Sequence, residues 1–377
     1  MRKTIAVLGS TGVIGTRTLE IAKHLQLKVA ALAAKSNIDL LEVQAAQVSP
    51  ELIAVFDKER AAELQRRLPH IPVLSGVEGL KEVAQFGPVD FTMLAMSGSC
   101  AIVPTLGAIE AGKQIGLANK EAMISAGELI SRRAREKGVD LIPVDSELSA
   151  LFQCLKGEKK ESVRRLILTA SGGPFFQRPK GGLAQVTLAE AMVHPHFQMG
   201  PKVAINSSTL MNKGLEMIAA QWFYGIDPLR IEAMIHPQQR VHACVEFVDG
   251  SILTQMCEPD MRFPIQYALS YPERVQGVLP PYDFFKNQKL EFFPPDLGKF
   301  RCLSLAIGAM REGKSFPCFL NGANEVLVER FLKKKISWNE IGEKLEKLIS
   351  SHDPQNLLTL EAILEVDATA RKKASVA

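Results

Sequence analysis

Short apolar runs alternate with amphipathic stretches over the first 145 residues of the chain. The amphipathic stretch after the first run carries Ile14, Leu19, Ile21, Ala22 and Leu25 at the spacing of one helical face. Strands that alternate with helices in this way predict a parallel sheet with right-handed crossovers, which is a doubly wound α/β domain over residues 1–145. The runs expected to form its strands are residues 5–8, 28–33, 52–56, 89–95, 114–118 and 139–144.

The pattern changes after Asp145. Residues 166–169 and 241–248 have the composition of strands, and Asp249-Gly250 is a strong turn signal before a further strand over residues 251–254. These features predict a central α+β domain over residues 146–270. A proline-rich passage over residues 271–296 is the expected linker, and the apolar spacing after it predicts a C-terminal helical bundle over residues 297–377.

Composition and charge exclude several classes of protein. The net charge of +4 is small, and the lysines and arginines are spread along the chain, so we expect no nucleic-acid partner. The most apolar stretch, residues 89–109, is interrupted by Ser97, Pro104 and Gly107 and indicates a strand and a helix, not a membrane span. Six scattered cysteines without a C-x-x-C pair, and a first strand that begins at once, predict a cytoplasmic protein.

A glycine-rich loop follows the first predicted strand and opens the first predicted helix. Its sequence is Gly9-Ser10-Thr11-Gly12-Val13-Ile14-Gly15, a G-x-x-G-x-x-G variant of the dinucleotide fingerprint. Small residues let the backbone approach a pyrophosphate, and a helix N-terminus offers N–H groups to it. The loop therefore predicts dinucleotide binding, and a plain tight turn is the alternative.

The residues after the second predicted strand indicate which dinucleotide binds. An acidic residue at this place favours NAD, because it accepts hydrogen bonds from the ribose, whereas this chain has Lys35-Ser36-Asn37. A cation and two hydrogen-bonding side chains suit a 2′-phosphate, so the sequence favours NADPH. The alternative is an exposed lysine in a turn, with Asp39 capping the next helix.

Charged triplets follow two strands of the predicted sheet. Asn119-Lys120-Glu121 comes after residues 115–118, and Asp145-Ser146-Glu147 comes after residues 141–144. Ligands of open α/β sheets bind outside the carboxyl ends of the strands, so both triplets lie where a substrate would bind. Ordinary helix-start chemistry is the alternative for either triplet alone. In extended backbone, Asp145 and Glu147 would point to the same side.

A third carboxylate, Glu216, belongs to the sequence Asn212-Lys213-Gly214-Leu215-Glu216. On a helix, Asn212 and Lys213 share a face with Glu216. Three oxygen ligands without histidine or cysteine spacing select a hard cation over zinc. Asp145, Glu147 and Glu216 therefore predict a Mg²⁺ or Mn²⁺ site.

Two segments are suited to bind a phosphate. Ser171-Gly172-Gly173 follows a predicted strand, and Asn206-Ser207-Ser208-Thr209 precedes the helix that carries Lys213. Helix capping is the alternative for Ser207 and Thr209. Between the two segments we expect a mobile lid over residues 172–201 without regular structure, since it is rich in glycine and proline. His194 and His196 within it are only a weak candidate for a metal pair.

Six motifs follow one another along the chain: LGSTG at 8–12, LANKE at 117–121, PVDSE at 143–147, SGGPF at 171–175, MNKGLE at 211–216 and EPDMR at 258–262. They resemble those of the 1-deoxy-D-xylulose 5-phosphate reductoisomerase family, in family order, and the resemblance covers essentially the whole chain. It implies rearrangement and reduction of 1-deoxy-D-xylulose 5-phosphate to 2-C-methyl-D-erythritol 4-phosphate in the non-mevalonate isoprenoid pathway, with NADPH and with Mn²⁺ or Mg²⁺ (Co²⁺ being a further candidate). It also implies a homodimer inhibited by fosmidomycin.

The resemblance implies a role for each candidate residue. The metal ligands would be Asp145, Glu147 and Glu216, and the catalytic residues would be Lys120, Glu147 and His194. The phosphorylated sugar would contact Lys120, Ser146, Glu147, Ser171, His194, Ser207, Asn212, Lys213 and Glu216. NADPH would contact Gly9, Thr11, Gly12, Val13, Ile14, Lys35, Ser36, Asn37, Asn119, Glu121 and Gly200.

Two departures and two other functions qualify this expectation. Leu148 stands where the family usually has a histidine, and Phe197 stands where a lid tryptophan is usual. An NADP-dependent semialdehyde dehydrogenase also begins with G-x-x-G-x-x-G, and Cys100 would have to be its nucleophile. A non-enzymatic NADPH-sensing module is the other alternative, but it would leave the three carboxylates and the phosphate segments unexplained.

The replacement Lys35→Glu tests the choice of NADPH. One charge-assisted hydrogen bond to the 2′-phosphate contributes roughly 1.5–3 kcal/mol, which is about ten- to hundredfold in affinity. We expect the wild type to prefer NADPH over NADH and Lys35→Glu to lose most of that preference, as measured by the dissociation constants of both nucleotides. Equal use of NADH by the wild type would contradict the prediction.

Overall fold

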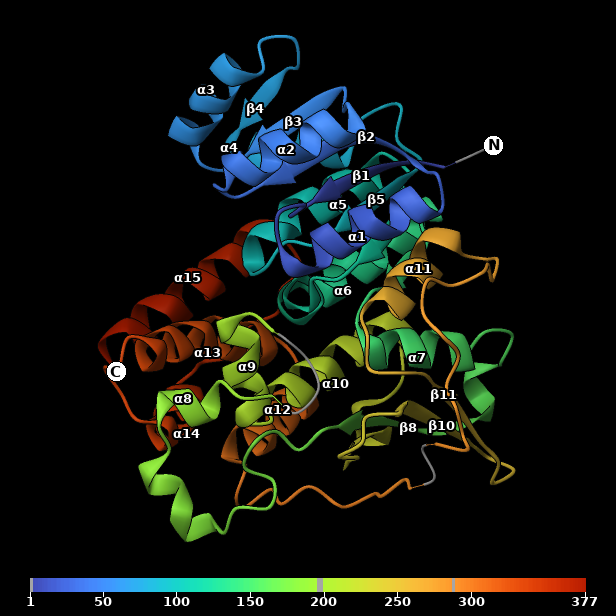
Figure 1. The fold of residues 1–377 in the computed structure, drawn as a ribbon. Coiled ribbons are helices and arrows are strands. Elements are labelled where there is room, and N and C mark those ends of the chain that lie inside the picture. Colours follow the sequence, from blue (N-terminus) through green and yellow to red (C-terminus); the bar gives the residue numbers. More distant parts are fainter. Residues whose placement is uncertain (1–2, 195–198, 287–288) are drawn as a thin grey trace. The chain divides into compact units, whose positions relative to one another are not determined.

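The apolar runs of the N-terminal part form a seven-stranded sheet in the order β4-β3-β2-β1-β5-β6-β7 (Figure 1). Every neighbouring pair of strands is parallel. The computed structural model describes residues 3–194, 199–286 and 289–377. The strands of this sheet are β1 (Thr4–Leu8), β2 (Lys28–Ala34), β3 (Leu52–Val55), β4 (Val73–Ser75), β5 (Phe91–Leu94), β6 (Gln114–Leu117) and β7 (Leu141–Pro143).

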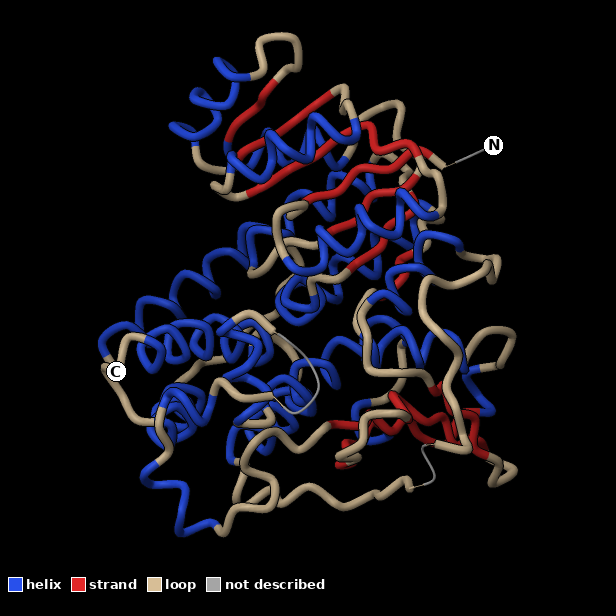
Figure 2. The backbone as a smooth tube through the Cα atoms, viewed as in Figure 1, coloured by secondary structure: helices blue, strands red, loops and turns tan. Residues whose placement is uncertain are grey.

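Helices alternate with these strands along the chain, as Figure 2 shows. Every residue of β3 and β5 is buried, as expected for parallel strands that are covered on both faces. The sequence pattern missed β4, whose three residues are only partly buried and give a weak apolar signal. The helices are α1 (Val13–His24), α2 (Ile38–Val48), α3 (Lys58–Arg67), α4 (Gly76–Ala84), η1 (Ser99–Ala101), α5 (Ile102–Glu110) and α6 (Lys120–Lys137).

The chain divides into two units, and the first consists of Met1–Ala122, Ile130–Ser149 and Met261–Pro280. Its last segment carries α11 (Arg262–Ser270), which packs against α1, β6 and β7. Lys3 Nζ also donates a hydrogen bond to the carbonyl oxygen of Tyr271 at 2.7 Å. Residues from the second half of the chain therefore cover the N-terminal sheet, an arrangement that no local pattern in the sequence predicts.

The second unit, Met123–Leu129, Ala150–Asp260 and Pro281–Ala377, contains a four-stranded sheet in the order β11-β10-β8-β9. β10 is antiparallel to β8 and β11, whereas β8 and β9 are parallel. Gly250, with a φ of +86°, lies in the turn between β10 and β11, so the hairpin expected at Asp249-Gly250 is confirmed. The strands are β8 (Val163–Ala170), β9 (Ile231–Ile235), β10 (Val241–Phe247) and β11 (Ile252–Met256).

Helix α10 (Met211–Tyr224) packs against β8 and β9 on one side and against α12 on the other. Gly214 makes the second contact close, because a Cβ added there would lie 2.3 Å from the Cβ of Ala306. The shorter elements of this part are α7 (Ser146–Cys154), η2 (Lys160–Ser162), η3 (Lys180–Gln185), α8 (Leu188–Ala191), α9 (Pro201–Ser208) and η4 (Pro228–Arg230).

The predicted C-terminal helical region is confirmed, with α13 at its centre in contact with α12, α14 and α15. The helices are α12 (Arg301–Glu312), α13 (Phe316–Leu332), α14 (Trp338–Ser350) and α15 (Leu360–Val376). Between α11 and α12, the described residues form no helix, and Phe293 makes a single bridge to Ile235. Within the described ranges, every helix is too short or too polar to cross a membrane. The α/β fold class with a helical C-terminal region is therefore confirmed.

A pair of glycine replacements tests the contact between α10 and α12. Gly214→Ala places a methyl group against Ala306, so we expect it to lower the free energy of unfolding by about 1–3 kcal/mol. Gly308, on α12, has open space around an added Cβ, so Gly308→Ala is expected to raise stability by about 0.5–1 kcal/mol. Melting temperatures of the two variants provide the comparison. Equal shifts in both would contradict the close packing.

Candidate active site

The glycine loop after β1 is folded tightly on its own backbone. Gly9 has a φ of +83°, and its N–H donates to the carbonyl oxygen of Ala33 at 2.8 Å. A Cβ added to Gly9 would lie 2.5 Å from the carbonyl oxygen of Ala95, and a Cβ added to Gly15 would lie 2.2 Å from the carbonyl oxygen of Gly9. Gly12 is the residue before α1, and a Cβ there meets only the oxygen of Gly9 at 3.3 Å. The loop therefore brings Thr11, Gly12, Val13 and Ile14 to the start of α1, as its sequence predicts.

This loop lies at the point where the strand order reverses. The chain runs outward from β1 through β2 and β3 to β4, and then returns to pair β5 with the other side of β1. In doubly wound sheets, the crevice at such a switch point binds the ligand. The contact of Gly9 with Ala95, which follows β5, places the loop at this crevice.

The segment after β2 leaves Lys35 and Ser36 exposed. Asn37 is the N-cap of α2, and its side-chain oxygen accepts a hydrogen bond from the N–H of Leu40 at 3.2 Å. The alternative interpretation, in which Asp39 caps this helix, is wrong, because Asp39 lies in the first turn and pairs with Arg67 at 2.7 Å. Lys35 and Ser36 remain accessible to a ligand, and Asn37 has a structural role.

The triplet after β6 combines a structural residue with a charged one. Asn119 caps α6 through the N–H of Ala122 at 2.7 Å, and its amide donates to the oxygens of Met96 and Gly98 at 2.9 and 3.0 Å. These bonds join the loops that follow β5 and β6. Lys120 begins α6 and forms an ion pair of 2.8 Å with Asp145, and only 13% of either side chain is exposed. Glu121 is the next residue of the same helix.

The triplet after β7 lies at the start of a helix. Ser146 begins α7, and its hydroxyl donates to the carboxylate of Glu147. Asp145 Oδ1 accepts a hydrogen bond from the N–H of Leu148 at 3.4 Å. Our argument from extended backbone for Asp145 and Glu147 is therefore wrong, because β7 ends at Pro143 and Glu147 is helical. The helix-start alternative holds for this triplet, and the two carboxylates are partly or wholly buried.

Helix α10 places the third carboxylate in the interior. Glu216 has a side-chain exposure of 1%, and it accepts hydrogen bonds from Lys213 and Asn212, three and four residues before it. Burial of an unpaired carboxylate would cost several kcal/mol, so these two donors are necessary for its position. The residue before the helix, Leu210, has a φ of +56°, in the left-handed region that favours glycine.

The three acidic side chains form a group that could hold a metal ion. One carboxylate oxygen each of Asp145, Glu147 and Glu216 lies within 4.8 Å of the other two. Hard divalent cations prefer oxygen ligands of this kind. The donor set therefore fits Mg²⁺ or Mn²⁺.

The turn after β8 lies against helix α9. Gly172 and Gly173 have φ values of +87° and +65°, and a Cβ on Gly173 would lie 2.8 Å from the oxygen of Ser207. Ser171 Oγ accepts a hydrogen bond from the N–H of Gly173 at 3.1 Å and lies 3.1 Å from His194 Nε2. The two segments that we expected to bind phosphate are thus neighbours.

Helix α9 is fixed by buried polar residues that the sequence analysis missed. The amide of Asn324 donates to Asn206 Oδ1 at 3.0 Å, and Trp338 Nε1 donates to Ser208 Oγ at 2.9 Å. Thr209 is the C-cap of α9, and its Oγ1 donates to the oxygen of Ile205 at 3.2 Å and accepts from the N–H of Met211 at 3.4 Å. Asn324, which is buried on α13 together with Asn321, was the available signal, since a buried amide needs a partner.

The 172–201 segment contains regular structure, so that part of the lid prediction is wrong. It includes η3 and α8, and α8 begins with a capping box formed by Thr187 and Glu190. A hydrogen bond from Arg178 lowers the pKa of Glu190 to about 2. Gly200 is the N-cap of α9. The candidates Phe197 and His196 lie outside the described residues.

Comparisons with known proteins give one consistent result. A family model described as 1-deoxy-D-xylulose 5-phosphate reductoisomerase matches residues 5–127, and the model of its C-terminal domain matches residues 141–224. A third model, DXP reductoisomerase C-terminal domain, matches residues 256–373. A protein named 1-deoxy-D-xylulose 5-phosphate reductoisomerase from Protochlamydia amoebophila is 52% identical over 375 residues, covering 99% of this chain and 98% of that protein.

Solved structures agree with the sequence comparisons. The reductoisomerase of Zymomonas mobilis in complex with NADPH has a TM-score of 0.93 and 37% identity, covering 100% of this chain and 99% of that one. A DOX-P reductoisomerase in complex with NADPH, fosmidomycin and magnesium has a TM-score of 0.94 and 36% identity, covering 99% and 98%.

Two glycine replacements separate the structural and binding roles of the loop after β1. Gly15→Ala would place a methyl group against backbone atoms, so we expect a loss of about 2 kcal/mol or more in stability. Gly12→Ala has one close contact, 3.3 Å from the oxygen of Gly9, which is much milder than the contacts at Gly15, and it places a methyl group where a pyrophosphate would approach. We expect it to melt near the wild-type temperature and to bind NADPH about tenfold more weakly. Normal NADPH affinity in Gly12→Ala would contradict the binding role.

Proposed function

This chain belongs to the 1-deoxy-D-xylulose 5-phosphate reductoisomerase family, and we propose that it carries out the family's reaction with the residues described above. It is an NADP-dependent oxidoreductase that converts 1-deoxy-D-xylulose 5-phosphate to 2-C-methyl-D-erythritol 4-phosphate with NADPH and a divalent metal such as Mg²⁺. The family matches favour this activity over a semialdehyde dehydrogenase with Cys100 as nucleophile. The observation that supports the assignment of residues is the group of three carboxylates next to Lys213 and Asn212.

Asp145, Glu147 and Glu216 are the proposed metal ligands. All three offer oxygen atoms, and their mutual approach within 4.8 Å brings negative charges together that a divalent cation would neutralise. The bound metal supplies a Lewis acid for neighbouring oxygens of the substrate. Lys120 pairs with Asp145, and Lys213 pairs with Glu216, so each lysine orients a ligand carboxylate and balances its charge.

Ser171, Ser207, Asn212 and Lys213 are the proposed contacts of the substrate phosphate. The glycine turn after β8 packs against Ser207, which brings two hydroxyl-bearing segments together. Lys213 carries a full positive charge, only 4% of its side chain is exposed, and a phosphate at this place would meet a desolvated cation. Because Lys213 also neutralises Glu216, we propose that it serves both the metal ligand and the phosphate.

Lys120, Glu147 and His194 are the proposed catalytic residues, and Ser146 is a further substrate contact. The hydroxyl of Ser146 holds the carboxylate of Glu147, and Ser171 Oγ holds His194 Nε2 at 3.1 Å. These bonds orient the carboxylate of Glu147 at the start of α7 and the imidazole of His194 toward the glycine turn after β8. Leu148, where an imidazole is usual, is 1% exposed and offers no proton.

The proposed NADPH site consists of the loop after β1, the exposed segment after β2 and the start of α6. NADPH supplies the hydride. The start of α1 offers backbone N–H groups to the pyrophosphate, and Lys35 and Ser36 are accessible to the 2′-phosphate. The proposed contacts are Gly9, Thr11, Gly12, Val13, Ile14, Lys35, Ser36, Asn37, Asn119, Glu121 and Gly200.

We further propose a cytoplasmic homodimer. β11 lies at the edge of the four-stranded sheet, and Ile252 and Leu253 on it are 55% and 44% exposed. An edge strand with exposed apolar side chains is a pairing surface for a second copy. All six cysteines are free thiols, as in a reducing compartment. Residues 1–145, 146–270 and 297–377 are the proposed nucleotide, catalytic and helical domains, joined by the linker 271–296.

The variants Asp145→Asn and Glu216→Gln test the metal ligands. Replacement of a residue that hydrogen-bonds to a metal ligand typically lowers metal affinity or activity about 10–100-fold. Replacement of a ligand itself should therefore lower kcat by at least about 100-fold. The dissociation constant of NADPH should change little in either variant. Asp140→Asn, an exposed carboxylate before β7, is the control and should behave as the wild type. Wild-type turnover in both ligand variants would refute the site.

The variant Lys213→Ala tests the phosphate contact, with kinetics on the phosphorylated substrate and on its dephosphorylated form. Loss of the charge should cost about 2–5 kcal/mol with the phosphorylated substrate, in both kcat and KM, because phosphate binding also orients the reacting atoms. The same replacement should change kcat and KM much less with the dephosphorylated sugar, which the wild type already converts slowly. An equal loss of kcat/KM on both substrates would mean that Lys213 serves only as the partner of Glu216 and does not bind the phosphate.

A further inference from the structure

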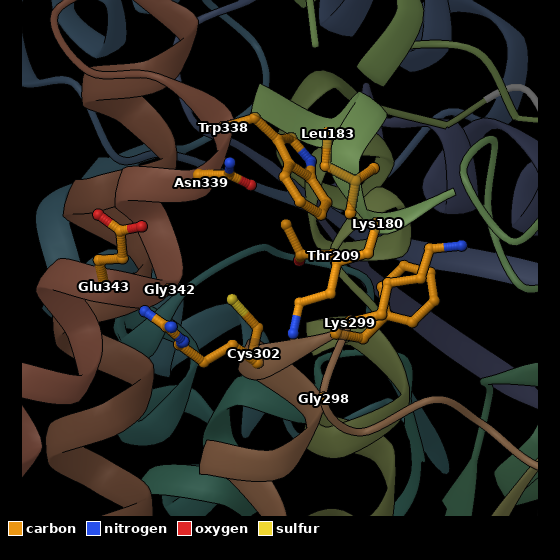
Figure 3. A pocket seen from close by; sticks show the side chains of 12 residues that line it. Lys180, Leu183, Thr209, Gly298, Lys299, Cys302, Trp338, Asn339, Gly342 and Glu343 are labelled. Carbon is orange, nitrogen blue, oxygen red and sulfur yellow. The ribbon is translucent and has the colours of Figure 1, made fainter. Parts of the chain in front are cut away.

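A cavity of about 170 Å³ lies in the second unit; Thr209 is among the residues that line it, and none of the lining residues is proposed for catalysis. Its walls come from η3, the start of α12 and the first two turns of α14 (Figure 3). This volume is below the roughly 300–1,000 Å³ of pockets for drug-sized ligands. It is therefore suited to a small molecule or a single charged group.

The charges around this cavity are mostly positive. Lys180, Lys299 and Arg301 line it together with one carboxylate, Glu343. A second carboxylate, Asp296, lies nearby, and its Oδ1 accepts a hydrogen bond from the N–H of Lys299 at 2.9 Å. Arg301 is only loosely paired, at 3.5 Å from Glu346. The lining itself thus carries three cations and one carboxylate, while Asp296 and Glu346, outside the lining, contact Lys299 and Arg301.

Lys180 is the cation that points into the cavity (Figure 3). Its ammonium group would lie 3.9 Å from a Cβ on Gly298, and among the described residues no carboxylate pairs with it. Lys299, in contrast, points away, and its Nζ donates to the oxygen of Phe176 at 2.7 Å. Burial lowers the pKa of Lys299, so the surroundings of this amine already disfavour its charge. An anion in the cavity would therefore be attracted mainly by Lys180.

The backbone adds further donors to the same place. Helix α12 begins at Arg301, and among the described residues no side chain caps its first turn, which lines the cavity through Arg301 and Cys302. Its unpaired N–H groups and the helix dipole favour an anion. Gly342 leaves room for the arginine, because a Cβ there would come within 3.3 Å of the Cβ of Arg301.

We propose that this cavity binds a compact phosphate-type anion, with Lys180, Arg301 and the start of α12 as its donors. An ammonium, a guanidinium and backbone N–H groups are donors of the kinds that bind phosphate in proteins. The lining also has apolar surface, from the rings of Phe300 and Trp338 and the methylene groups of the lysines. A short carbon chain attached to the anion would pack against this surface.

Binding here would also restrain η3. Lys180 belongs to η3, between Ser171 and His194, whereas Arg301 belongs to α12. One anion held by both residues joins η3 to the helical bundle. An effect of this restraint on the active site would rest on the proposed function of Ser171 and His194, whereas the binding of the anion does not.

Calorimetric titration of the full-length enzyme with inorganic phosphate tests the proposal. The enzyme is first saturated with NADPH, Mg²⁺ and fosmidomycin, so that phosphate does not compete for the sites proposed above. We expect one phosphate to bind, with an affinity that Lys180→Met lowers about tenfold or more. Glu343→Gln, which removes the acidic lining residue, should raise the affinity roughly two- to fivefold.

The controls separate this site from general charge effects and from the substrate site. Lys347→Met removes an exposed cation from the end of the same helix α14 and should leave phosphate binding unchanged. Chloride at equal ionic strength should not compete. If fosmidomycin fails to fill the substrate site, a further phosphate will bind there, and Lys180→Met will not affect it. If Lys180→Met melts at the wild-type temperature and binds phosphate with the wild-type affinity, the proposal is overturned.

Discussion

The buried carboxylate of Glu216 is the constraint on which the catalytic part of this protein depends. Its side chain is 1% exposed, and removal of such a charge from water costs several kcal/mol unless it is paired. Lys213 and Asn212 provide the pairing from the same helix, which fixes the rotamers of all three side chains. A divalent cation beside Asp145 and Glu147 would add to this compensation. The position of Glu216 thus depends on these two hydrogen-bond donors.

The position of α10 follows from this requirement. Gly214 lets α10 approach Ala306 of α12 closely, and the left-handed conformation of Leu210 turns the chain from α9 into α10. α9 is held in turn by hydrogen bonds from Asn324 and Trp338, which belong to the C-terminal helices. The helical region therefore positions the residues at the end of α9, although none of its residues is a proposed ligand of substrate, metal or NADPH.

The sequence predicts those features whose cause is local. The buried parallel strands, the glycine loop after β1 and the shared face of Asn212, Lys213 and Glu216 follow from composition and spacing, and the structure has all of them. The candidate roles of single residues came from motifs and from the family resemblance, and they stay proposals.

Other features depend on contacts between distant residues, and the sequence did not predict them. The packing of α11 on the N-terminal sheet brings together distant segments, as in the ion pair of Arg262 with Glu20, which are 242 residues apart. β4 is short and partly exposed, and the capping box at Thr187 gives structure to a segment that its glycines and prolines led us to expect as irregular. Glu147 was placed in extended backbone because the end of β7 could not be located from a run of apolar residues.

The central claim is that carboxylates, a divalent metal and NADPH act together on a phosphorylated sugar. The most direct measurement is NADPH oxidation by the metal-stripped wild-type enzyme with 1-deoxy-D-xylulose 5-phosphate, before and after addition of Mg²⁺ or Mn²⁺. We predict no turnover in excess chelator, recovery with either metal, and 2-C-methyl-D-erythritol 4-phosphate as the product. Full turnover in excess chelator, or NADPH oxidation without that product, would contradict the account.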